Sequence, residues 1–305
     1  MKKLNLLLGL IFFITLLYSP TTMAKPKEAA QVLLYVDGQS VVYKKITKQG
    51  RTENMISLRA AASALHLNLT WSASSKEWLL SSATHTIKVK LNSTTAYVDN
   101  QKKTLKMAPM LDNGTLYIPI RFIVESSGGT LQYYKGDDMA LIWVLSSEQE
   151  ALNSALLSDN VKQLKHLLKD WRALTIPMGV DGMLPYDFAT DSVAETKVLL
   201  DAGFPINYQE FEYTQIGIPN HGYTLLHNAV SHGQLEVVQY LLDNGADPNL
   251  FTKTGFADAL GLAKWGKSSA SEGFFDYKNK DRDAMVQKYE AIIALLEKHI
   301  SEGLF

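Results

Sequence analysis

The 305-residue chain contains no cysteine. This absence excludes disulfide bonds, thiolate metal ligands, cysteine nucleophiles and a lipid attached to an N-terminal cysteine. The formal net charge is only −1, so the overall charge gives no reason to expect a nucleic-acid partner. The sequence also lacks a Gly-x-Ser-x-Gly elbow, a phosphate-binding loop and a dinucleotide-binding fingerprint. We therefore expect a protein that is not an enzyme, with no cofactor and no metal site.

Long apolar runs are absent after the first 24 residues, which have the pattern of a secretory signal peptide. Lys2 and Lys3 precede an apolar core from Leu4 to Leu17, and Thr22-Met23-Ala24 offers small residues before a cleavage point. The core is shorter than the roughly 20 residues that span a membrane, although retention as an uncleaved anchor is the alternative. We expect a secreted or cell-envelope protein with no stable membrane span after cleavage.

Residues 220–249 carry the clearest motif of the chain. Gly222 permits a tight turn, Thr224 can cap a following helix, and Gly245 can end a second helix. The apolar positions have helical spacing and are Leu225, Leu226, Ala229, Val230, Val237, Val238, Leu241 and Leu242. This stretch resembles a full ankyrin repeat, which is a β-turn followed by two antiparallel helices. The resemblance implies that His227 ties neighbouring turns by hydrogen bonds.

A single repeat cannot bury its own apolar face, so neighbouring repeats are expected. Residues 152–169 have the pattern of a helix pair, and residues 181–203 have a repeat start and end with a shortened turn. A last copy starts near Gly255, and an inserted polar loop at roughly residues 267–286 separates its two helices. We expect an all-α ankyrin solenoid of about four repeats over residues 148–303.

Residues 31–145 contain two similar units of short strands and a helix. The first unit spans residues 55–71 and the second spans residues 117–133. In each unit a strand enters a helix, at Leu58-Arg59 or at Ile120-Arg121, and a second strand follows. This internal duplication predicts one α+β domain.

The pattern resembles the stalk domain of bacterial cell-surface proteins, also called the copper amine oxidase N-terminal-like domain. The resemblance implies antiparallel strands with two short helices. Ser57 departs from the family pattern because it stands where the second unit has Pro119. The resemblance implies no copper or oxidase chemistry, and the two histidines of this region, His66 and His85, are isolated in sequence.

The joint between the two domains, residues 146–150, is short and polar and has no flexible-linker composition. Close packing of the two domains is therefore expected. Because the joint shows no sign of a shared core, we also expect a fragment that begins near Ser147 to fold alone.

The resemblance to ankyrin repeats implies binding of a protein partner at turn tips and the concave helix face, with the stalk domain as spacer or anchor. The candidate contact residues are Asn220, His221, Tyr223, Ser231, His232, Phe251, Phe274 and Phe275. The last two lie in the insertion, where they either fold back onto the repeat or form a partner-binding lip. Although His221, His227 and His232 lie close in sequence, we expect structural or surface roles for them and no metal site.

Two other functions remain open. One is a cell-wall or polysaccharide-attachment module, in which the stalk aromatics Trp71, Trp78, Tyr133 and Tyr134 stack on sugars. The other is a regulator or inhibitor of an exported enzyme. In each case we expect a monomer, and the sequence does not identify the partner.

Overall fold

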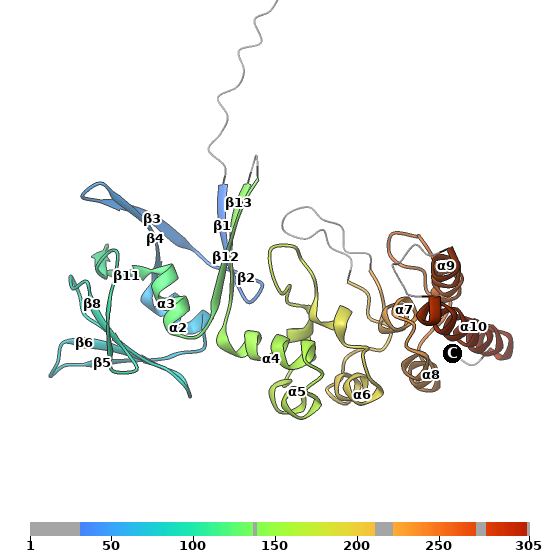
Figure 1. Cartoon of the computed structure of the whole chain (residues 1–305). Coiled ribbons are helices and arrows are strands. Elements are labelled where there is room, and N and C mark those ends of the chain that lie inside the picture. The colour runs from blue at the N-terminus through green and yellow to red at the C-terminus, as the bar shows by residue number, and fades with distance from the viewer. Residues whose placement is uncertain (1–30, 137–138, 211–221, 273–278, 304–305) are drawn as a thin grey trace, which may run out of the picture.

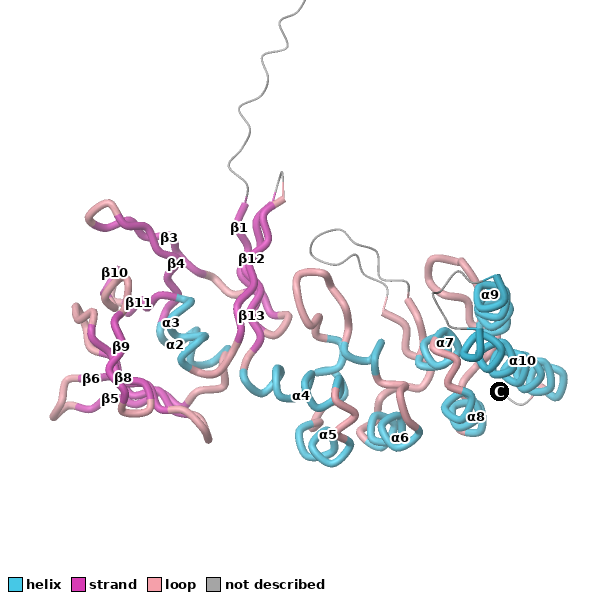
Figure 2. Tube along the Cα trace, viewed as in Figure 1, coloured by secondary structure: helices cyan, strands magenta, loops and turns pink. Residues whose placement is uncertain are grey.

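The computed structural model describes residues 31–136, 139–210, 222–272 and 279–303. A β-rich domain comes first and a helical region follows it (Figures 1 and 2). The strands are β1 (Gln31–Val36), β2 (Gln39–Ser40), β3 (Tyr43–Lys48), β4 (Arg51–Ser57), β5 (Asn68–Ser72), β6 (Glu77–Ser81), β7 (Thr86–Val89), β8 (Thr95–Val98), β9 (Gln101–Thr104), β10 (Met110–Asp112), β11 (Thr115–Pro119), β12 (Thr130–Lys135) and β13 (Met139–Leu145). The helices are α2 (Leu58–Ala64), α3 (Ile120–Ser126), α4 (Ser147–Leu157), α5 (Val161–Leu167), α6 (Val193–Asp201), α7 (Leu225–Ser231), α8 (Leu235–Asp243), α9 (Ala259–Glu272), α10 (Asn279–Glu302) and the 3₁₀ turns η1 (Trp171–Thr175) and η2 (Pro185–Phe188).

Within the described ranges, the strands form three sheets with the orders β12-β13-β1-β2, β10-β11-β4-β3 and β5-β6-β7-β8-β9. The neighbours in these sheets are antiparallel except for β1 and β13, which run parallel from Gln31↔Met139 to Val36↔Val144. The predicted domain of mostly antiparallel strands with short helices is therefore confirmed. The parallel pair was not predicted, because it joins the first and last strands of the domain and has no local sequence signal.

The duplicated units meet at the centre of the N-terminal domain. Strand β4 leads into α2 and β11 leads into α3, and the two strands pair so that Ile56 lies opposite Ile118. Both isoleucines are buried. Ser57 caps α2 by accepting a hydrogen bond from the Ala60 backbone N–H at 3.1 Å, whereas Pro119 starts α3 without a side-chain cap. The departure at Ser57 therefore replaces a proline start with a hydrogen-bonded cap.

The helices are arranged in two rows. One row contains α4, η2, α7 and α9, and the other contains α5, α6, α8 and α10, each element contacting the next one in its row. Figure 2 shows the two rows side by side, joined by the turns. The C-terminal region is thus helical, as predicted, whereas the solenoid of about four repeats stays a prediction.

The prediction that the inserted residues form a loop is wrong. Helix α9 continues to Glu272 and α10 already begins at Asn279, so most of the extra residues lengthen the two helices. The serine-rich composition indicated a loop, but Ser269 and Ala270 are buried, and this packing outweighs a modest helix propensity. Close contact is possible because a Cβ atom at Gly266 would lie 2.5 Å from the ring of Tyr289.

The segment predicted to be the second repeat differs from the third repeat in its first helix. Only the 3₁₀ turn η2 forms there, where the third repeat has α7. Pro185 fits the first position of a helix, and Asp187 accepts a hydrogen bond from the Leu184 backbone N–H at 3.3 Å. The shortened segment follows from the spacing, because this repeat has fewer residues between its turn and its second helix.

The domain joint contains a shared core, which corrects the expectation of independent halves. Leu141, Trp143 and Leu145 form a buried cluster on β13, and Ile176 and Val180 from the helical half pack against it. The Trp143 indole N–H donates to the Pro177 carbonyl oxygen at 3.1 Å. The predicted close packing is therefore observed, and a fragment cut at residue 147 would lose part of this core.

Candidate partner-binding surface

His227 connects the third repeat to the loop that follows it by hydrogen bonds. Its backbone N–H donates to the Thr224 hydroxyl at 3.2 Å, and its Nδ1 accepts from the Thr224 backbone N–H at 3.0 Å. Because Nδ1 is an acceptor, Nε2 carries the proton and donates to the Leu250 carbonyl oxygen at 2.9 Å. Burial lowers the pKa of His227, so the imidazole is neutral near pH 7. The structural role predicted for His227 is confirmed.

Two amide side chains connect successive turns by hydrogen bonds. Gln209 Nε2 donates to the carbonyl oxygens of Gly222 and Phe251, both at 2.8 Å. Asn207 Oδ1 accepts from the Asp247 backbone N–H at 2.9 Å. Sequence reasoning missed both residues, although Asn207 follows its helix-ending glycine by the same four positions as Asn249 does in the third repeat. These bonds hold the turns in a fixed relative position.

Three turns share a glycine in the left-handed region, followed by a large apolar residue. Gly182, Gly222 and Gly255 have φ angles of +78°, +62° and +69°. The residues that follow them are Met183, Tyr223 and Phe256, which we call the tip row. The turns of Gly222 and Gly255 touch, because a Cβ atom at Gly222 would lie 2.3 Å from Cγ of Lys253. The second and third of these turns therefore lie against each other.

Two members of the tip row expose apolar side chains. Met183 is 53 % exposed and Phe256 is 64 % exposed, and the nearby Phe251 is 56 % exposed. Tyr223 between them is half-buried. Large aromatic and methionine side chains are enriched at protein interfaces, so this arrangement suits a protein partner.

The predicted contact residues do not all lie on this surface. Phe251 and His232 are exposed, whereas Ser231 is half-buried and its carbonyl oxygen accepts a hydrogen bond from the Tyr289 hydroxyl at 2.9 Å. Four of the predicted residues lie outside the described ranges, namely Asn220, His221, Phe274 and Phe275. Sequence reasoning missed Met183 and Phe256, although the glycine before each of them was a usable signal.

Tyr223 corrects one expectation, because it is not a freely projecting tip. Its ring packs against the repeat core, and its centroid lies 5.7 Å from that of His227. Burial raises the pKa of the Tyr223 hydroxyl, and a hydrogen bond with Ser231 opposes this shift. A Tyr223→Ala change would therefore affect folding as well as binding.

Glu195 on α6 is an ionisable group in the core of the helical region. The residue is 0 % exposed, and neither carboxylate oxygen has a hydrogen-bond partner of normal geometry. Burial and the nearby Asp159 and Asp191 raise the pKa of Glu195 to about 8, against a weaker opposing contact from the Asp191 backbone. The carboxyl group is therefore mostly protonated at neutral pH.

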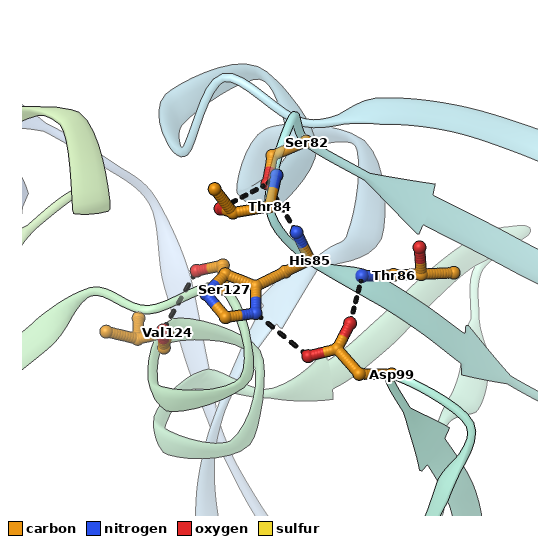
Figure 3. A network of polar contacts seen from close by, with 7 residues as sticks. All are labelled: Ser82, Thr84, His85, Thr86, Asp99, Val124 and Ser127. Carbon is orange, nitrogen blue, oxygen red and sulfur yellow. Dashed lines mark hydrogen bonds and ion pairs between the residues drawn. The ribbon is translucent and has the colours of Figure 1, made fainter.

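A polar network in the N-terminal domain includes a carboxylate, an imidazole and a hydroxyl (Figure 3). His85 Nδ1 lies 3.0 Å from Asp99 Oδ2, and Asp99 Oδ1 accepts from the Thr86 backbone N–H at 2.7 Å. The hydrogen bond from His85 lowers the pKa of Asp99. Ser127 is only 1 % exposed and donates to the Val124 carbonyl oxygen at 2.8 Å, so it is not placed to attack a substrate. The network ties turns of the domain together.

A cleft of about 1160 Å³ lies where the two halves meet. Asp37 and His66 contribute from the N-terminal domain, and Trp171, Arg172 and Glu210 contribute from the helical half. The Arg172 guanidinium stacks over the Trp171 ring at 5.0 Å. Because its walls carry both signs of charge, the cleft favours no single ligand chemistry.

Two family models match this chain. Residues 35–142 match the copper amine oxidase N-terminal domain, and residues 217–260 match ankyrin repeats (many copies). Both expected families are found. The ankyrin repeats indicate a protein partner and a non-catalytic role, and the copper amine oxidase N-terminal domain is not the catalytic part of that enzyme. No curated protein matches the chain.

The donor set of the copper amine oxidase N-terminal domain does not fit a copper site. Among the residues with described positions, no three His, Cys, Asp or Glu side chains come together to hold a metal ion. His85 is engaged with Asp99, and His66 lies in the cleft. The same described ranges contain no helix with the length and hydropathy needed to cross a membrane.

Proposed function

We propose that this chain is an exported, non-catalytic binding protein that captures a protein partner on the tip row, with the copper amine oxidase N-terminal domain as spacer or anchor. The observation that carries this proposal is that Met183, Tyr223 and Phe256 each directly follow a left-handed glycine of a turn. Two of these side chains are more than half exposed. Folding alone favours polar residues at such positions, so the exposed apolar area is best explained by a partner.

Charge further defines the proposed partner. Residues 146–305 carry 22 acidic and 13 basic side chains. An acidic surface raises the association rate of a partner with a basic patch and disfavours acidic competitors. The proposed partner therefore presents an apolar anchor within a basic surface. Export is supported by the signal-peptide pattern of the first 24 residues and by a stalk-like domain that fits an extracellular context.

Site-specific photo-crosslinking tests this proposal. A photoreactive amino acid at position 256 should give one discrete covalent adduct in the native cell envelope, because the side chain would lie inside the interface. The control is the same amino acid at position 157, since Leu157 is also apolar and 56 % exposed but lies on α4, away from the turns. Equal adducts from both positions, or none from position 256, would rule out the tip row as the binding surface.

A further inference from the structure

The N-terminal domain has more basic than acidic residues, unlike the helical region that follows it. Residues 31–145 carry 13 basic and 8 acidic side chains, whereas the rest of the chain from residue 146 is acidic. The ion pairs of this domain within the described ranges are Lys44–Asp112, His85–Asp99 and Arg121–Glu125. Most of its lysines are therefore not neutralised by a neighbouring carboxylate.

Several of these lysines lie on the outer face of the five-stranded sheet β5–β9. On β7, Ile87 and Val89 are buried in the core, so the alternating residue Lys88 points to the opposite face. On β8, Ala96 is buried and Tyr97 is 40 % exposed. The side chains of this outer face are absent from the hydrophobic clusters of the described chain.

Strand register places a tyrosine between two lysines on this face. Lys88 pairs with Tyr97, and Tyr97 pairs with Lys102. Because neighbouring strands lie about 4.8 Å apart, the two lysine Cα atoms are roughly 10 Å apart with the tyrosine midway. Lys90 lies just past the end of β7.

Protection of a sheet edge does not explain the whole arrangement. Lysines on the edge strand β9, such as Lys102, discourage pairing with another chain. Lys88 lies on β7, which has β6 and β8 as neighbours and therefore needs no such protection. Its ammonium group donates to Asn100 Oδ1 at 3.3 Å and has no carboxylate partner in the described structure. Asp99, in the turn between β8 and β9, is already engaged by His85.

The four aromatic residues that were predicted to stack on sugars are less suitable for this role than Tyr97. Trp71 pairs with Trp78 across β5 and β6 at 4.3 Å, on the same face of the sheet as the core residue Val89. Tyr134 packs into the cluster at the domain joint. Tyr133 is 54 % exposed, but it lies on β12 in a different sheet. These four residues therefore do not form one platform.

We propose that the outer face of β7–β9 binds an anionic polysaccharide. The ring of Tyr97 provides a flat surface for a sugar ring, and Lys88 and Lys102 on either side pair with its anionic groups. This sheet lies at the opposite end of the molecule from α9 and α10 (Figure 1). The tip row and the polysaccharide face can therefore be occupied together, and this proposal does not depend on the proposed protein partner.

Binding of polygalacturonate by the purified protein tests the proposal, because that polymer has one carboxylate on each sugar ring. Lys88→Gln/Lys102→Gln should weaken binding about tenfold, since it removes two charged contacts. Tyr97→Ala should weaken it to a similar extent through loss of stacking. Lys45→Gln/Lys48→Gln is the matched control, because it removes the same charge from β3 in another sheet. All variants should keep the wild-type circular dichroism spectrum and melting temperature.

Three results would overturn the proposal. Equal loss in the two double-lysine variants would show that only net charge matters. Equal binding of neutral dextran would show that the lysines do not contribute to polymer binding. Equal binding of inorganic polyphosphate with no effect of Tyr97→Ala would show a general cationic surface without a sugar platform. The proposal is supported if the wild type prefers polygalacturonate, if Lys88→Gln/Lys102→Gln and Tyr97→Ala each lose this preference, and if the control variant keeps it.

Discussion

A single buried carboxyl group, Glu195, makes the stability of the repeat region sensitive to pH. Its folded pKa is about 8, well above its ordinary value of 4.5. The unfolded chain therefore loses this proton at lower pH than the folded chain does. Stability from this group is fully present below about pH 4.5, declines as pH rises, and has been lost above about pH 8.

Glu195→Gln should remove this pH dependence. Glutamine has the same shape and no proton to lose, so the variant should gain about 1–3 kcal/mol in unfolding free energy relative to the wild type between pH 5 and pH 8. Urea unfolding at pH 5, 7 and 8.5 measures this difference. Glu236→Gln on the exposed start of α8 is the control and should follow the wild-type curve. Parallel curves for Glu195→Gln and the wild type would mean that Glu195 is charged in the folded protein.

Among the helices, α8 should contribute most to the stability of the repeats. Leu241 is 0 % exposed on α8, a helix that contacts both α6 and α10. Leu241→Ala should therefore cost about 2–5 kcal/mol, the range for truncating a fully buried leucine. Gln239→Ala, on the exposed face of the same helix, should cost far less. Thermal melts of the two variants test the assignment of the buried face, and equal shifts would contradict it.

The agreement between sequence and structure differs from element to element for physical reasons. Elements specified by local patterns were predicted, such as α7 and α8, whose apolar spacing and caps lie within one short stretch. The continuation of α9 to Glu272 was missed because it depends on the close approach of Tyr289 to Gly266, which serine-rich composition does not reveal. Phe256 was missed for another reason, since the pattern of a glycine before a large side chain is recognised only when three turns are compared.

Across the whole molecule, the cluster at the domain joint should couple the unfolding of the two halves. Trp143 is 3 % exposed, stacks on Tyr35 at 5.6 Å and donates to the Pro177 carbonyl oxygen. We expect the wild type to melt in one transition and Trp143→Ala to melt in two. Replacement of a buried tryptophan costs about 3–5 kcal/mol, and here it also removes the contact between domains.

Differential scanning calorimetry measures the number of transitions directly. Trp71→Ala is the matched control, because Trp71 is 49 % exposed and lies far from the joint in sheet β5–β9. It should retain one transition. If the two tryptophan variants melt alike, or if the wild type already shows two transitions, the joint does not couple the halves.

The parallel pairing of β1 with β13 also determines when the N-terminal domain can be completed. Strand β1 can pair with the adjacent β2 early, but its parallel partner, residues 139–145, comes last in the domain, so one edge of β1 is among the last to be covered. Such a long-range contact slows folding relative to local hairpins such as β5–β6. During synthesis or export, this edge of β1 stays open to other strands until the chain has emerged past residue 145, and the helical region begins immediately after that point. Completion of the N-terminal domain and the start of helical folding are therefore linked in time as well as in space.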